Sequence, residues 1–226
     1  MQNLKRNLQA IAQSLPQNVT LVAVSKFHSA EAIQEAYDAG QRVFGESYAL
    51  ELKEKYDVLP HDIEWHFIGH LQTNKIKYII PFVKLIHSID SIKLLNEVNR
   101  QAANCNRVVD CLLQVHVAQE ETKFGFSPEE CLSVGANIDL KQLTNIRIRG
   151  IMAMASNTDN EERISKEFHL VKQLFDILRS STWKENTTFD ILSMGMSADY
   201  KLAVMAGSNM VRIGSKIFGE RFFLRK

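Results

Sequence analysis

The sequence has few cysteines and no long apolar run. Its three cysteines, Cys105, Cys111 and Cys131, form no CxxC pair, which argues against a disulfide framework and against a thiolate zinc site. No run of about 18 apolar residues is present, so we expect no membrane-spanning helix. Residues 1–15 lack the apolar segment of a signal peptide. We therefore expect a cytoplasmic protein with reduced thiols.

An excess of charge of one sign is also missing. The chain has 27 Lys and Arg residues against 26 Asp and Glu residues, a net charge of +1, which indicates neither a nucleic-acid partner nor an anionic membrane. Hydrophobic residues make up 45% and charged residues 23%, as in a folded globular protein. Only four prolines and ten glycines occur, with no low-complexity stretch that would indicate a linker. We expect one domain over residues 1–226.

Familiar nucleotide-binding and nucleophile motifs are absent too. The chain contains no Walker A, GxGxxG or GxSxG sequence. His66 and His70 are four residues apart, but the glutamate of an HExxH zinc site is missing and the segment has the pattern of a strand and a turn. For these histidines we favour a structural or ligand-lining role over metal binding.

What the chain does have is a regular alternation of short apolar runs and amphipathic segments. Strands are predicted at residues 19–24, 42–45, 64–68, 85–88, 108–117, 146–154, 191–193 and 210–213. Helices are predicted at residues 4–15, 29–37, 48–56, 72–79, 91–103, from a capping box at 127–130, from Asp159, at 197–206 with Ser197 as the cap, and after Gly214. Eight such units predict an α/β fold, a closed (β/α)8 TIM-type barrel with an extra N-terminal helix; an open doubly wound sheet is the alternative.

Lys26 follows directly after the first apolar strand. In a parallel barrel the functional groups gather at the carboxyl ends of the strands. A lysine at that position is partly desolvated, which favours the neutral amine and hence Schiff-base chemistry. The alternative is a lysine that only extends past the strand end into solvent.

Two turns rich in glycine and serine follow the last two strands. Gly195 and Ser197 follow residues 191–193, and Gly214 and Ser215 follow residues 210–213. Loops in these two places form the recurrent phosphate site of such barrels, where free backbone N–H groups face the anion. The alternative for Ser197 is a helix cap without a ligand.

Arg212 lies between two apolar residues of the last strand. Alternation makes it face opposite to Val211 and Ile213. If it faces the barrel interior it needs a partner, because an isolated buried guanidinium is very costly. A ligand atom and a buried carboxylate are both open at this point.

Several separated stretches resemble the pyridoxal phosphate homeostasis protein family, which is similar to the N-terminal barrel of alanine racemase. The most specific stretch is WHFIGHLQTNK at residues 65–75. The others follow in the family's order: VAVSK at 22–26, GQRVFGE at 40–46, SMGMSAD at 193–199, VRIG at 211–214 and IFGER at 217–221.

The resemblance implies pyridoxal 5′-phosphate (PLP) as the cofactor and a role for each matching residue. Lys26 would carry PLP as an internal aldimine. The phosphate would be held by Ser197 together with Gly214 and Ser215.

The resemblance also implies a pocket for the cofactor ring. Arg212 would face the pyridine nitrogen, and Met194 and His66 would line the ring pocket. An arginine is effectively always charged, so at this place it would oppose protonation of the ring and make the cofactor a poorer electron sink.

The chain departs from the family pattern at two places near the expected pocket. Ser47 stands where the family usually has asparagine before Tyr48, and His116 stands in place of the asparagine of a Gln-Val-Asn stretch. No side-chain contact is carried over to Ser47 or His116.

These observations favour a PLP-binding protein that buffers the cofactor and delivers it to apo-enzymes, rather than an efficient catalyst. Racemisation needs an acid–base group on each face of the substrate carbon, and only Lys26 is evident in the sequence. With no second domain to form racemase dimer contacts, we expect a monomer. The alternatives are a PLP-dependent amino-acid racemase or related enzyme, a cofactor-free Schiff-base aldolase acting on a phosphosugar, and a pure interaction module.

Overall fold

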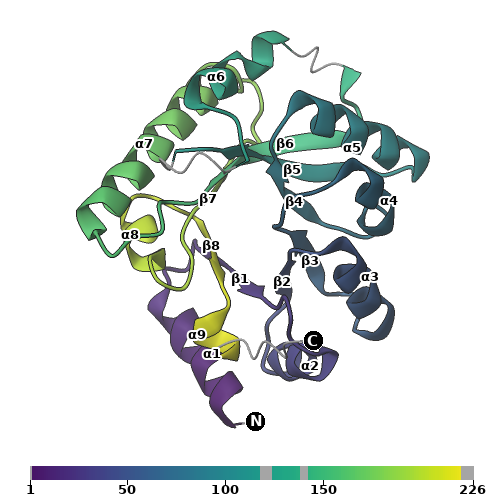
Figure 1. The fold of residues 1–226 in the computed structure, drawn as a ribbon, viewed down its shortest axis with the longest axis vertical. Coiled ribbons are helices and arrows are strands. Elements are labelled where there is room, and N and C mark those ends of the chain that lie inside the picture. Colours follow the sequence, from purple (N-terminus) through teal and green to yellow (C-terminus); the bar gives the residue numbers. More distant parts are fainter. Residues whose placement is uncertain (1, 118–123, 138–141, 220–226) are drawn as a thin grey trace.

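Eight parallel strands form a closed barrel in the computed structural model, which describes residues 2–117, 124–137 and 142–219 (Figure 1). Each strand pairs with the next in the chain, and β8 pairs with β1. The strands are β1 Thr20–Val24, β2 Val43–Glu46, β3 Glu64–Phe67, β4 Leu85–Ile89, β5 Val109–Val115, β6 Ile146–Ala153, β7 Ile191–Ser193 and β8 Met210–Ile213. The closed order confirms the predicted barrel and excludes the open sheet.

Helices cover the outside of the barrel between the strands. They are α1 Gln2–Ser14, α2 Ala30–Asp38, α3 Ala49–Val58, the 3-10 turn η1 Thr73–Lys75, α4 Ile76–Ile79, α5 Ile92–Asn104, α6 Pro128–Asn137, α7 Glu161–Ser180, α8 Tyr200–Met205 and α9 Ser215–Phe218. Helix α1 precedes β1, as predicted, and lies beside α9 (Figure 1). The amide of Asn7 donates to the carbonyl of Ile217 at 3.3 Å, which ties these two helices together.

The ends of three helices test the capping predictions. At α6 the capping box is present: Glu130 N–H donates to Ser127 Oγ, and Ser127 N–H donates to the Glu130 carboxylate. At α7 the cap is Asn160, one residue after the predicted Asp159. The start predicted for α8 at Ser197 is wrong. Because Asp199 N–H bonds back to the carbonyl of Met196, these residues form a turn, and the helix begins only at Tyr200.

Residues along each strand alternate between two apolar environments. The larger core lies between the strands and the helices and includes Ala23, Cys111 and Leu113. A smaller cluster lies inside the barrel and includes Val22 and Leu112, the strand neighbours of those residues. Burial on both faces explains why the strands have nearly continuous apolar sequences.

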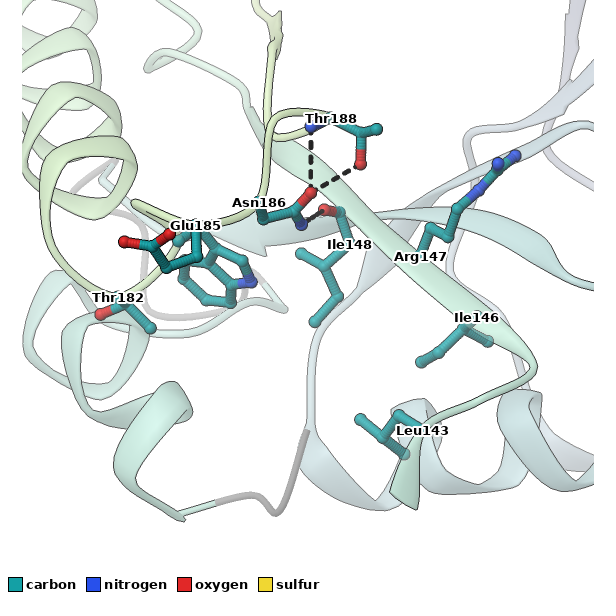
Figure 2. Close-up of a pocket in the computed structure, with 9 residues that line it drawn as sticks. Leu143, Ile146, Arg147, Ile148, Thr182, Glu185, Asn186 and Thr188 are labelled. Atoms are coloured by element: carbon teal, nitrogen blue, oxygen red, sulfur yellow. Dashed lines mark hydrogen bonds between the residues drawn. The ribbon is translucent and has the colours of Figure 1, made fainter. Parts of the chain in front are cut away.

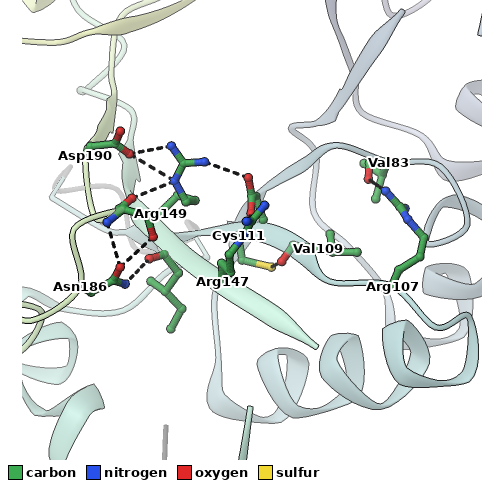
Figure 3. Close-up of polar contacts among 11 residues, drawn as sticks. Val83, Arg107, Val109, Cys111, Arg147, Arg149, Asn186 and Asp190 are labelled. Atoms are coloured by element: carbon green, nitrogen blue, oxygen red, sulfur yellow. Dashed lines mark hydrogen bonds and ion pairs between the residues drawn. The ribbon is translucent and has the colours of Figure 1, made fainter. Parts of the chain in front are cut away.

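Ion pairs fill the amino-terminal end of the barrel between β5, β6 and β7 (Figure 3). The buried carboxylate of Asp110 accepts from Arg147 Nε at 2.6 Å and from an Arg149 guanidinium nitrogen at 2.9 Å. Arg149 also pairs with Asp190 at 2.8 Å. At this end Arg147 and Arg149 therefore each have a carboxylate partner, whereas Arg107, just before β5, donates to the backbone carbonyls of Ile80 and Val83.

Candidate functional site

Lys26 lies in a tight turn at the carboxyl end of β1. The turn runs from Ser25 to His28 and is closed by His28 N–H donating to Ser25 O at 3.0 Å. Phe27 adopts the left-handed conformation, with φ of 66°, which is uncommon for a bulky residue. Lys26 itself is partly buried, as expected of a residue at the mouth of the barrel.

A cavity of about 710 Å³ opens beside this turn. Lys26 lines it, and the other lining groups come from the segments after β2 and β3 and from β5 and β6. They include the polar side chains of Ser47, His70, Gln72 and Gln114. The predicted Lys26 is thus at the edge of a space large enough for a small organic ligand.

The two turns predicted to hold phosphate meet in the structure. Gly214 N–H donates to Ser197 Oγ at 3.2 Å, which joins the end of β8 to the turn after β7. Gly214 also lies against the end of β1, since a Cβ atom on it would be 3.1 Å from Val24 O. Ser215, the first residue of α9, follows at the same place. These turns and the turn of Lys26 therefore share one end of the barrel.

Arg212 faces the inside of the barrel, as alternation predicts. Val211 and Ile213 belong to the core on the helix side, whereas Arg212 lies at the position opposite to theirs and is 4% exposed. Its guanidinium donates to Ser193 O at 3.0 Å, to Ser193 Oγ at 2.7 Å and to Ala153 O at 3.0 Å. Burial lowers its pKa to about 10, although the negative charge of Asp199 acts to raise that pKa. Its hydrogen-bond partners among the described residues are neutral oxygen atoms of β6 and β7, so neither a ligand nor a bonded carboxylate is needed to explain its place.

A chain of hydrogen bonds connects Arg212 to His66 through the barrel interior. His87 Nδ1 lies 3.2 Å from Ser193 Oγ, and His87 Nε2 lies 3.0 Å from His66 Nδ1. Burial lowers the pKa of His66 to about 3, and burial also lowers that of His87 well below its usual range. Both rings are therefore neutral at neutral pH.

The direction of this chain follows from the arginine, which can only donate. Ser193 Oγ accepts a hydrogen bond from Arg212 and donates one from its own O–H group to His87 Nδ1. His87 then donates from Nε2 to His66 Nδ1, which leaves the proton of His66 on Nε2. The chain fixes the tautomers of both rings and ties Arg212 to a predicted site residue.

Met194 and Gly195 have mainly structural surroundings. Met194 is fully buried in the core on the helix side, and it is not among the described residues that line the cavity of Lys26. Gly195 has φ of 94°, and a Cβ atom on it would lie 2.6 Å from the Cβ of Ala203. Its missing side chain therefore allows α8 to pack closely against the end of β7.

The two positions that depart from the family pattern lie near the mouth. Ser47 lines the cavity, and its backbone touches Gly69: a Cβ on Gly69 would be 2.3 Å from Ser47 O. This contact explains the glycine within the stretch at residues 65–75. His116 follows β5, and its buried Nε2 has no hydrogen-bond partner among the described residues.

A histidine–aspartate pair lies at the same cavity. His70 Nδ1 is 3.0 Å from Asp90 Oδ2, and the ring of His70 stacks on Phe124 with centroids 3.9 Å apart. The sequence does not indicate that His70 and Asp90 pair, because the two residues follow different strands. Position was the available signal, since each comes just after a predicted strand.

A second cavity, of about 500 Å³, lies at the other end of the strands (Figure 2). It is lined by the start of β6 and by the loop before β7. Asn186 spans this region, accepting from Thr188 and donating to Ile148 O at 3.2 Å.

No helix in the described part of the chain is long and apolar enough to cross a membrane.

Comparisons with known proteins agree with this arrangement. A family model described as the N-terminal domain of alanine racemase matches residues 1–221. The pyridoxal phosphate homeostasis protein of Helicobacter pylori is 40% identical over 204 residues, which cover 89% of this chain and 88% of that protein. This chain belongs to the pyridoxal phosphate homeostasis protein family. The family member of Escherichia coli is 35% identical over 218 residues, which cover 93% of this chain and 89% of that protein.

Solved structures extend the likeness to the fold. The structure of PipY from Synechococcus elongatus was determined with PLP bound. It matches this chain with a TM-score of 0.86 and 34% sequence identity, and the match covers 96% of this chain and 100% of the PipY chain. Alanine racemase of Clostridium difficile has a TM-score of 0.74 at 18% identity and is matched over 60% of its length, which shows the shared barrel alone. The family resemblance found in the sequence is confirmed. Glu220 and Arg221, which end the last matching stretch, lie outside the described residues.

Proposed function

We propose that this chain binds PLP covalently through Lys26 and acts in PLP homeostasis, as a carrier that buffers the cofactor and delivers it to apo-enzymes rather than as an efficient catalyst. The observation that carries the proposal is the meeting of three segments at one end of the barrel. The turn of Lys26, the Ser197–Gly214 contact and the buried Arg212 all belong to that end. The names of the relatives and the PLP bound in PipY support the same ligand.

Lys26 is the residue that would make the covalent bond. Its neutral Nζ condenses with the aldehyde carbon of PLP to give the C=N bond of an aldimine, and one water leaves. Such a bond holds a reactive aldehyde reversibly, because a water molecule or another amine releases it again. The cavity beside Lys26 leaves room for that exchange.

The phosphate would lie between the turns after β7 and β8. Ser197 and Ser215 supply hydroxyl groups there, and Gly214 lets the backbone approach closely. Backbone N–H groups and hydroxyls hold phosphate without a fixed cation. In this proposal the phosphate displaces the Ser197–Gly214 hydrogen bond or shares its donors.

Arg212 would face the pyridine nitrogen and His66 the side of the ring, and Met194, directly after β7, would line the ring pocket. The barrel interior fits this role, since the described residues supply Arg212 with neutral acceptors only. Bound PLP can withdraw electrons from a substrate carbon, most strongly when its ring nitrogen is protonated. A charged guanidinium opposes that protonation, which supports a carrier over a strong carbanion catalyst.

A PLP-dependent amino-acid racemase is the second candidate, and one contact favours it. His70, which is bonded to Asp90, lines the cavity that Lys26 also lines, so a second proton-transferring group is available there. The racemase predicts conversion of at least one L-amino acid to its enantiomer, with loss of activity in both Lys26→Ala and His70→Ala. Absence of conversion across a panel of amino acids would leave the carrier.

The test of the main proposal is a visible absorbance titration with PLP. Wild-type protein should develop a yellow absorbance band. Borohydride should bleach this band and convert the aldimine to a stable reduced adduct. Lys26→Ala should give no such band. Transfer is then measured by mixing loaded protein with a PLP-dependent apo-enzyme and following recovery of its activity. A protein that stays colourless with added PLP would overturn the proposal and favour the phosphosugar aldolase. We also predict that the protein is cytoplasmic and monomeric. Size-exclusion chromatography with light scattering tests the monomeric state.

A further inference from the structure

The turn that carries Lys26 is held from behind by four polar side chains, Ser25, Glu46, Glu51 and Lys55, which we name the Glu46 cluster. Ser25 and Glu46 are fully buried, and Lys55 is 6% exposed. A buried ammonium is costly unless every N–H group finds an acceptor. The contacts of Lys55 therefore indicate what the cluster holds in place.

Lys55 reaches from α3 to the ends of both β1 and β2. Its Nζ donates to Ser25 O at 2.9 Å, to Glu46 Oε1 at 2.7 Å and to Glu51 Oε1 at 2.7 Å. A lysine ammonium has three N–H donors, so all of them are used. Ser25 Oγ donates to the same Glu46 oxygen at 2.6 Å. The peptide group just before Lys26 is thus fixed to the cluster.

The peptide group just after Lys26 is fixed to the cluster as well. Phe27 N–H donates to Glu51 Oε1 at 2.6 Å, the oxygen that also accepts from Lys55. Phe27 has the left-handed φ of 66°, which is unfavourable for a side chain of this kind. Glu51 therefore compensates a strained conformation directly beside Lys26.

We propose that Glu51 and Lys55 are positioning residues for Lys26: they anchor the peptide groups on both sides of it and so set the direction from which its amine meets an aldehyde. Neither residue is among the described residues that line the cavity, so both act through the turn and not by touching the ligand. The inference rests on the proposed function, since it concerns the covalent step at Lys26.

Glu51 is the better of the two for a test. Its side chain is 22% exposed, so its loss leaves no closed hole in the core. Removing Lys55 would leave the buried Glu46 carboxyl without its cation, and such a variant could fail to fold. Glu51→Ala removes the acceptor for Phe27 N–H, whereas Glu51→Gln keeps an amide oxygen at the same place. Glu54→Ala is the matched control, because Glu54 is an exposed glutamate on the same helix.

Two ligands separate positioning of Lys26 from general damage. PLP has the aldehyde that reacts with Lys26, while 4-deoxypyridoxine 5′-phosphate has a methyl group there and binds without a covalent bond. Glu51→Ala removes the hydrogen bonds from both Phe27 N–H and Lys55 Nζ. We expect the affinity for PLP and the rate of the borohydride-trapped adduct to fall about tenfold, the effect of losing the charge-assisted hydrogen bond that fixes the peptide group after Lys26. The affinity for the deoxy analogue should be unchanged, and Glu51→Gln should restore most of the loss.

Each other outcome has a separate meaning. Equal behaviour of Glu51→Ala and Glu54→Ala with PLP would overturn the positioning role. An equal loss of affinity for PLP and for the analogue would also overturn it, because that result indicates damage to the whole pocket. Wild-type protein that binds both ligands equally and forms no trapped adduct would instead contradict the proposed covalent function. Thermal unfolding of all variants confirms that they are folded.

Discussion

The two ends of the barrel surround the arginines of β6 and β8 differently. At the amino-terminal end Arg147 and Arg149 share the carboxylate of Asp110, and Arg149 also binds Asp190 (Figure 3). Toward the carboxyl-terminal end Arg212 is more deeply buried, and its hydrogen bonds go to a hydroxyl and two carbonyl groups. The charges of Arg147 and Arg149 are neutralised by direct pairing, whereas that of Arg212 has no bonded carboxylate among the described residues.

On the proposed function, this difference separates an end that stabilises the barrel from an end that meets the ligand. A paired cluster stabilises the barrel only if every charge keeps its partner. Burying a cation among neutral groups costs desolvation free energy, but its positive charge is not cancelled and can still act on a ligand that enters the mouth of the barrel. The neutral chain from Ser193 through His87 to His66 gives Arg212 a fixed orientation without cancelling its charge.

Removal of Asp110 should have the largest effect on stability. Asp110→Ala leaves Arg147 and Arg149 without their shared acceptor, and loss of one partner from a buried ion pair costs about 3 kcal/mol. The free energy of unfolding from urea denaturation measures this. PLP affinity should not change, because the cluster lies at the opposite end of the strands. Asp190→Ala is the control, since Asp190 is 48% exposed and should cost much less. Equal costs for the two variants would contradict the account.

Acid should lower the free energy of unfolding through the neutral histidines buried in the barrel interior. In the unfolded chain a histidine has its ordinary pKa of about 6.5, whereas burial lowers the pKa of His66 to about 3 in the folded protein. Between these values the unfolded chain binds more protons, so the free energy of unfolding falls as the pH falls. From pH 7 to pH 5 the contribution of His66 is about 2 kcal/mol.

The variant His66→Gln isolates this effect. Burial raises the pKa of Glu46 to about 7, so Glu46 acts in the opposite direction over part of the same range, and a single pH curve mixes the two. The difference in unfolding free energy between wild type and His66→Gln removes the Glu46 contribution. That difference should move in favour of the variant as the pH falls, and parallel curves would show that His66 is not held neutral.

Replacement of Arg212 should affect the ligand more than the fold. Arg212→Met removes a desolvated charge together with three hydrogen bonds, so the two changes in unfolding free energy oppose each other. PLP affinity should fall about tenfold, equivalent to about 1.4 kcal/mol. Arg212→Lys keeps the charge but not the planar group and should recover only part of the affinity. Wild-type affinity in Arg212→Met would show that the cation does not face the cofactor.

Arg147 should give the smallest effect of the set. Its side chain is 52% exposed, so its pair with Asp110 is largely screened by water. Arg147→Ala should lower the unfolding free energy by about 1 kcal/mol or less, the usual range for exposed pairs. Asp110 keeps Arg149 in this variant. A loss as large as that of Asp110→Ala would mean that Arg147, rather than Arg149, carries the cluster.

The fold was predictable, and candidate site residues could be selected, because the signals for both are local. Apolar runs alternate with helical periods, and Lys26, Ser197 and Gly214 each come shortly after the end of such a run. The confirmed barrel order then brings the strand ends together. The error at Ser197 is local too: serine favours helix caps, but the sequence does not reveal that Met196 and Asp199 close a turn before α8.

The supporting contacts were not predictable, since they join residues far apart in the chain. His87 and Ser193 are 106 positions apart, and Lys55 reaches from α3 to Ser25 in the turn after β1. Only the closed barrel brings such pairs together. One signal was present for His87: like Arg212, it is a polar residue within an apolar strand, on the face that turns inward.

The most direct test of the central claim is to map the adduct to a residue. Protein loaded with PLP is reduced with borohydride and digested, and the modified peptides are identified by mass spectrometry. The account predicts that the reduced pyridoxyl group is on Lys26 at stoichiometric yield, with only traces on surface lysines. Modification confined to other lysines, or no stable adduct at all, would contradict a carrier that holds PLP through Lys26.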